Sequence, residues 1–180
     1  MMIRNVLAAL ALTILVACTA TPYDMPAPER AAMEQTVQQF SADFRNGRTA
    51  SVVDIVPPKV TANLAKRAGI PVADLRRGVI QQTRAAMKLV KVVSYGMDTK
   101  QAQFFQTSTG RGYALIPTQT VIRAPGGQTI QSNNTTLAFA DAGKWYLVRI
   151  DDASQRELLV DAYPEFSGLR VADGTTKVIG

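Results

Sequence analysis

The hydrophobic positions along the chain change their spacing near Leu89. Before this residue they recur every three or four positions, which is typical of amphipathic helices. After it, β-branched and aromatic residues dominate long runs separated by glycine-rich turns, which is typical of strands. Helices that precede an antiparallel sheet predict a single domain of the α+β class.

Four helices are expected in the first half of the domain. The stripe of the first helix includes Phe40 and Phe44, so we expect this face to pack in the core, and Gly47 is placed to end the helix. Pro58 and Pro71 are placed to open the third and fourth helices, because the first helical turn needs no N–H from them. The expected helices cover residues 30–47, 49–56, 58–68 and 71–89.

Five strands are expected in the second half, followed by a short helix at about residues 155–162 and a loop. Pro117 interrupts the third strand, and because proline has no N–H for the ladder, it predicts an edge or a bulge there. The last strand carries apolar residues on both sides, so we expect both of its faces to be covered. The expected strands cover residues 90–97, 102–108, 112–123, 128–140 and 144–150.

Three segments carry a resemblance to a known superfamily. They are RAAMEQTVQQFSADFRNG, the hairpin VIRAPGGQTI, and TTLAFADAGKWYLVRID. In this order they resemble the nuclear-transport-factor-like, cystatin-like superfamily over residues 30–163. The resemblance implies N-terminal helices on a strongly curved, cone-like sheet with an apolar pocket at its wide end. The residues expected to line that pocket are Phe40, Phe44, Tyr95, Tyr113 and Trp145.

The N-terminal residues have the pattern of an export signal. Arg4 supplies a positive charge, and residues 6–17 form an apolar run that is too short to span a bilayer. The run Leu15-Val16-Ala17-Cys18 then resembles the lipobox of bacterial lipoproteins, in which the cysteine thiol is acylated and the chain is cut just before it. The alternative is a signal peptide with a chance cysteine near its end.

The lipobox resemblance predicts three parts of the chain. Residues 1–17 are the signal peptide, cleaved after Ala17; residues 18–29 are a lipidated, proline-rich linker that starts at Cys18; and residues 30–180 are the domain. A lipid on Cys18 would attach the protein to a membrane of the bacterial envelope. In lipoproteins of the enterobacterial type an aspartate after the cysteine tends to retain the protein in the inner membrane, and here Thr19 stands there, so the resemblance implies the outer membrane, facing the periplasm, over the inner membrane.

The residue types that are missing restrict the chemistry. The chain has no histidine and one cysteine, so it has no Ser–His or Cys–His pair and no zinc site of the usual kind. We therefore expect no cofactor and no metal. An isomerase-like or cyclase-like enzyme would need a buried carboxylate and a tyrosine, for which Asp43 or Asp54 and Tyr95 or Tyr113 are candidates. Spacing selects none of them as catalytic, and Asp43 is expected to be exposed to solvent.

The charge of the chain is positive, +6 overall, and it is unevenly distributed. Between residues 55 and 97, eight basic residues stand against one acid, Asp74. Either this is a solvated helical face, or it binds an anionic lipid headgroup or cell-wall polymer; nucleic acid is not expected outside the cytoplasm. The expected contact residues are Arg76, Arg77, Arg84 and Lys88.

These observations favour a non-catalytic binding or scaffold module on a lipid anchor. Its ligand would be a small apolar molecule in the pocket. Alternatively, a second copy or another envelope protein would bind the sheet face around residues 145–150. An enzyme, and a domain that binds an anionic surface, are the other two hypotheses.

Overall fold

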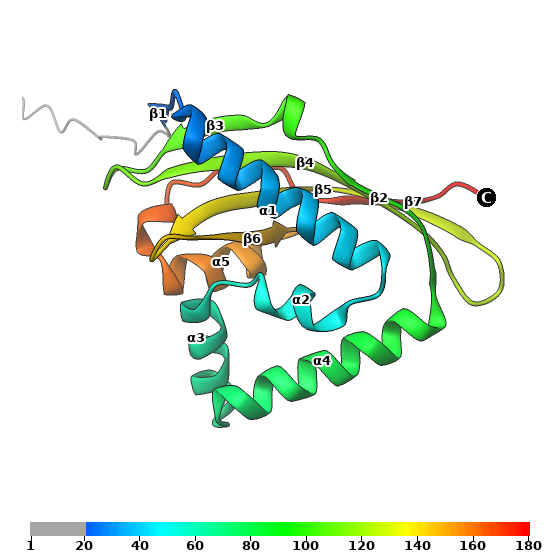
Figure 1. The fold of residues 1–180 in the computed structure, drawn as a ribbon. Coiled ribbons are helices and arrows are strands. Elements are labelled where there is room, and N and C mark those ends of the chain that lie inside the picture. The colour runs from blue at the N-terminus through cyan, green and yellow to red at the C-terminus, as the bar shows by residue number, and fades with distance from the viewer. Residues whose placement is uncertain (1–20) are drawn as a thin grey trace, which may run out of the picture.

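The computed structural model describes residues 21–180 and confirms the α+β class, with helices packed on an antiparallel sheet (Figure 1). Two short 3-10 helices, η1 (Thr99–Gln101) and η2 (Pro164–Phe166), join longer elements. The helices are α1 (Ala27–Arg45), α2 (Thr49–Asp54), α3 (Pro58–Ala68), α4 (Val72–Leu89) and α5 (Ala153–Ala162). The strands are β1 (Thr21–Pro22), β2 (Lys91–Met97), β3 (Gln103–Gln106), β4 (Gly112–Arg123), β5 (Thr129–Asp141), β6 (Lys144–Ile150) and β7 (Thr175–Val178).

Strand β4 lies in the middle of the sheet, although Pro117 had predicted an edge or a bulge. It pairs with β5 on one side, while β3 and β2 share the other side. Pro117 falls between these two partners, and its carbonyl accepts a hydrogen bond from the Asp98 N–H at 2.8 Å. The position that lacks an N–H therefore faces a break in the pairing, which is why a central strand tolerates this proline.

The two faces of the sheet carry separate hydrophobic cores, as expected from the strand alternation. On one face, Met33 and Val37 of α1 pack on the small and aliphatic residues of β4, β5 and β6. The other face is closed by α3, α5 and η2, with an aromatic cluster at its centre. The residues of that second core are Val60, Tyr113, Leu115, Leu137, Phe139, Ile150, Leu159, Tyr163, Phe166 and Leu169.

Strand β6 is covered on both faces, as its sequence predicts. Trp145 and Leu147 face α1, and Ile150 belongs to the core beneath α5. These side chains are at most 8% exposed. They therefore serve the interior of the chain itself, and do not form an open sheet face for a second copy.

The segment predicted to be a linker is part of the fold from residue 21 onward. Residues 21 and 22 form β1 against β3, and Met25 is 7% exposed in the core beneath α1. Pro26 is the N-cap of α1, and Pro28 lies in its first turn, where no backbone N–H is needed. These prolines begin a helix and do not mark a flexible segment. The signal peptide, Ala17 and Cys18 lie outside the described residues.

Helix α4 forms as predicted, but its apolar face is only partly covered. It packs against α2 and α3, on the side of α2 away from α1 (Figure 1). No residue of α4 is buried, and Val72, Val79 and Leu89 are 41%, 39% and 68% exposed. The C-terminal residues differ from the expected loop, because four of them form the exposed edge strand β7 against β5.

Candidate functional site

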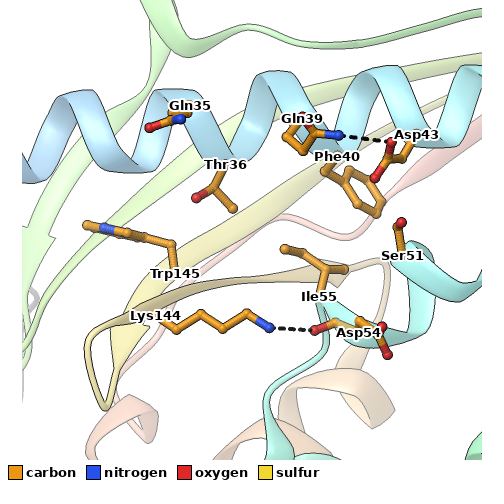
Figure 2. Close-up of a pocket in the computed structure, with 10 residues that line it drawn as sticks. All are labelled: Gln35, Thr36, Gln39, Phe40, Asp43, Ser51, Asp54, Ile55, Lys144 and Trp145. Atoms are coloured by element: carbon orange, nitrogen blue, oxygen red, sulfur yellow. Dashed lines mark hydrogen bonds between the residues drawn. The ribbon is translucent and has the colours of Figure 1, made fainter.

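A pocket of about 360 Å³ opens between α1, α2 and the start of β6 (Figure 2). We call it the α1–α2 pocket. Its walls combine three large apolar side chains with polar groups that line the opening. The residues that line it are Gln35, Thr36, Gln39, Phe40, Asp43, Ser51, Asp54, Ile55, Lys144 and Trp145.

Three elements bring the apolar walls together. Phe40 comes from the middle of α1, Ile55 follows the end of α2, and Trp145 is the second residue of β6. The N–H of Leu147 donates to the Ile55 carbonyl at 3.1 Å, so the end of α2 is fixed against the edge of β6. The Lys144 ammonium donates to the Asp54 carbonyl at 3.3 Å and closes one side of the opening (Figure 2).

Asp43 is buried, 6% exposed, which corrects the expectation that it faces solvent. Its carboxylate accepts from the Gln39 amide at 3.0 Å and from the Arg48 guanidinium at 2.9 Å. A hydrogen bond from the Ser51 hydroxyl and the positive charge of Arg48 lower the pKa of Asp43, and they outweigh the opposing effect of burial. The pocket therefore contains a fixed, ionised acceptor at neutral pH.

Asp54 has a different environment, although it lines the same pocket. Its carboxylate is half exposed and forms an ion pair with Arg76 of α4. The pair joins the pocket to α4 across α2. Arg76 is thus paired within the molecule.

The five aromatic residues predicted to share a pocket are divided between two places. Phe40 and Trp145 line the α1–α2 pocket. Phe44 and Tyr95 lie beside it, with Phe40–Phe44 and Phe44–Tyr95 ring centroids 6.2 and 4.3 Å apart. Tyr113 lies on the opposite face of the sheet, where its ring contacts other core aromatics. Odd and even positions of a strand face opposite ways, and this separates Tyr113 from the rest.

The four candidate residues do not form an isomerase-like pair; the part-buried tyrosine–carboxylate hydrogen bond of 2.8 Å joins Tyr163 to Asp141 instead. Neither Tyr95 nor Tyr113 donates a hydrogen bond to Asp43 or Asp54 in this part of the chain. Burial raises the pKa of both tyrosines, so their hydroxyls stay protonated. The lowered pKa of Asp43 is the reverse of the raised carboxyl pKa that such a general base needs.

Six lining residues were not predicted as site residues: Gln35, Thr36, Gln39, Ser51, Ile55 and Lys144. The spacing of Gln39 and Asp43, one helical turn apart, is a signal that places the amide beside the carboxylate. Ser51 reaches Asp43 only because the turn at residues 46–48 folds α2 back along α1. No local pattern in the sequence predicts that approach.

The predicted basic contact residues also differ from one another. Arg76 pairs with Asp54, and Arg77 pairs with Asp74 at 3.0 Å. Arg84 and Lys88 form no salt bridge with any residue that the structure describes. Of the four predicted contact residues, only Arg84 and Lys88 therefore carry a charge that no described residue pairs with.

The described part of the chain, residues 21–180, offers neither a metal-binding cluster nor a membrane-spanning helix. No group of three or more acidic or cysteine side chains in this range could hold a metal ion. No helix in this range is both long and apolar enough to cross a membrane. No family model, curated protein or solved structure matches the chain, so the superfamily resemblance stays a prediction.

Proposed function

We propose that this protein is a lipid-anchored protein of the bacterial envelope that binds a small, mostly apolar molecule in the α1–α2 pocket without transforming it. The observation that carries the proposal is the pocket wall formed by Phe40, Ile55 and Trp145. Ligand pockets commonly combine apolar walls of this kind with a few polar groups that fix orientation. The ionised Asp43 and the Lys144 ammonium supply such groups here.

The pocket is better suited to holding a molecule than to proton transfer. Asp43 has a lowered pKa and three hydrogen-bonding neighbours, so it is a poor base at neutral pH. The same hydrogen bonds fix the carboxylate in one orientation. A fixed acceptor beside an aromatic wall favours recognition of a ligand with an apolar body and a hydrogen-bond donor.

Trp145 provides a direct test, because it is the only tryptophan in the chain and lines the pocket. The probe is the neutral apolar dye N-phenyl-1-naphthylamine, which accepts excitation energy from tryptophan. We expect saturable energy transfer from Trp145 to the bound dye. Thr36→Phe places a ring in the pocket and is expected to weaken dye binding at least tenfold.

The matched control is Gln38→Phe, which adds the same ring to an exposed position of α1 outside the pocket. It is expected to bind the dye as the unmodified protein does. Equal binding by the Thr36 and Gln38 variants would place the dye elsewhere and reject the pocket. Absence of any saturable transfer from Trp145 would reject the proposal in the same way.

The lipid anchor has its own test. Cys18→Ser removes the thiol that the lipobox resemblance predicts to be acylated. We expect loss of labelled palmitate incorporation and a shift of the protein from the membrane fraction to the soluble fraction. Unchanged labelling and membrane association in this variant would contradict the lipoprotein prediction and leave the pocket proposal standing.

A further inference from the structure

The corner where α4 passes into β2 presents two strongly exposed apolar side chains. Leu89, the last residue of α4, is 68% exposed, and Val93 of β2 is 51% exposed. Figure 1 shows this corner at the end of α4 farthest from α3. The register of β2 shifts between Val92 and Ser94, so Val93 lies at an irregularity of the strand. Neither Leu89 nor Val93 belongs to a core cluster.

Unpaired cations lie close in sequence to these apolar side chains. Arg84 and Lys88 lie one helical turn apart on α4 and therefore share a face, and Lys91 follows two residues after the helix. Within residues 21–180, none of the three forms a salt bridge. The other end of α4 differs, because its arginines are paired with Asp54 and Asp74.

A fourth cation, Arg123, lies opposite Lys91 in the sheet. Lys91 of β2 lies directly opposite Arg123 of β4 in the antiparallel register, and both side chains are exposed. Like charges directly opposite each other on paired strands destabilise a sheet. Arg123 also forms no salt bridge with a described residue. The arrangement costs stability in the isolated chain, and a negatively charged partner would remove that cost.

We propose that this corner, formed by Arg84, Lys88, Leu89, Lys91, Val93 and Arg123, docks on the surface of an anionic lipid bilayer. Leu89 and Val93 enter the headgroup region, and the four cations interact with lipid phosphates. Basic residues near an anionic membrane and apolar side chains at its interface both favour such binding. The exposed apolar pair favours a bilayer over a cell-wall polymer, because a polar polymer gains nothing from Leu89.

This inference goes beyond the proposed ligand binding and depends neither on the pocket nor on a lipid at Cys18. It concerns contact with the membrane surface, in agreement with the absence of a spanning helix among residues 21–180. It also gives the exposed Leu89 at the end of α4 a use. Two of the four predicted contact residues, Arg84 and Lys88, belong to the proposed membrane-binding corner. The other two, Arg76 and Arg77, are paired within the domain.

The test is sedimentation of unlipidated residues 18–180 with vesicles, since this piece contains every element that the structure describes. Vesicles of phosphatidylcholine mixed with phosphatidylglycerol are compared with vesicles of phosphatidylcholine alone. We expect binding to the mixed vesicles only, with a loss at high salt. Arg84→Gln combined with Lys88→Gln is expected to lower the partition coefficient about 25-fold, about fivefold per cation. Leu89→Ser is expected to lower it about tenfold.

Matched controls change residues of the same charge or apolar character elsewhere. Lys66→Gln combined with Lys100→Gln removes two exposed, unpaired cations outside the corner, and Val72→Ser replaces an exposed valine at the other end of α4. Circular dichroism checks that each variant is folded. The proposal is overturned if the mixed vesicles are not bound, or if the controls weaken binding as much as the corner variants. Binding to isolated peptidoglycan that Leu89→Ser leaves intact, without vesicle binding, would assign the corner to a polymer instead.

Discussion

Helices α1 and α4 have nearly the same length, 19 and 18 residues, and both carry apolar residues at helical spacing. Their surroundings differ. In α1, Met33 and Val37 are at most 3% exposed, and they pack on the sheet. In α4 no residue is buried, because the helix packs only along one side, against α2 and α3. An apolar stripe therefore predicts a helix, but it does not predict which part of the protein covers that helix.

The same contrast separates the charges of the two helices. Asp43 of α1 is buried and held by Gln39 and Arg48, so its charge is part of the structure. The cations at the end of α4 have no partner among the described residues. Helix α1 satisfies its polar and apolar groups within the domain and offers only its side of the α1–α2 pocket to a small ligand. A helix that leaves both unsatisfied is where we expect an external partner.

The largest expected effect comes from shortening the central core side chain of α1. Met33 is 0% exposed, so Met33→Ala leaves a cavity and is expected to cost about 2–5 kcal/mol of unfolding free energy. Val79→Ala at the middle of α4, where the valine is 39% exposed, is expected to cost less than about 1 kcal/mol. Urea denaturation measures both. Similar losses of unfolding free energy in the two variants would contradict the distinction between a buried α1 and an exposed α4.

A second prediction concerns the pH dependence that Asp43 gives to α1. Its pKa in the folded protein is lowered below the ordinary value of 3.8, so its contribution to stability is present above that pH and is lost as the pH falls through the folded pKa. Asp43→Asn is therefore expected to be less stable than the unmodified protein at pH 7. The difference should shrink on acidification below 3.8.

The control for this prediction is Asp74→Asn in α4, which breaks the exposed pair with Arg77. Such surface pairs contribute about 0.2–1 kcal/mol, so this change is expected to be small. Urea denaturation over a pH series measures both variants. A stability difference for Asp43→Asn that is independent of pH would show that the carboxylate acts by packing and not by its charge.

The smallest expected effect is that of Leu89→Ser. Since Leu89 is 68% exposed, the substitution removes almost no buried surface and is expected to change the unfolding free energy by less than about 0.5 kcal/mol. Thermal unfolding followed by circular dichroism measures it. A larger loss would mean that Leu89 supports the domain, and the side chain would then not be free to enter a bilayer.

Much of the fold follows from the sequence, because the spacing of hydrophobic residues and the turn residues are local features. Strands β4 and β6 begin and end at the predicted residues, and the glycine-rich turns at residues 124–127 and 142–143 join the predicted neighbours. Strands β1 and β7 were not predicted. Their side chains are exposed, so no hydrophobic alternation marks them, and only backbone pairing makes them strands.

The site was less predictable, because it depends on contacts between distant segments. Phe40 and Trp145 were found from aromatic character, but nothing local indicated that Tyr113 faces the other way. Asp43 was expected in solvent because polar residues flank it, and the turn that brings Arg48 and Ser51 over it is a tertiary feature. Proline content similarly predicted a linker where Met25 enters the core.

The central claim is that α1 is the covered helix of the core and α4 is a partly covered helix whose exposed end binds membranes. Native-state hydrogen exchange tests it most directly, because amides in a packed core open rarely and those of a weakly covered helix open more often. We expect α4 amides to exchange faster than those around Met33 in the free protein. Vesicles that contain phosphatidylglycerol should slow exchange near Leu89 and leave α1 unchanged. Exchange of α4 as slow as that of α1 without vesicles, or unaffected by them, would contradict the account.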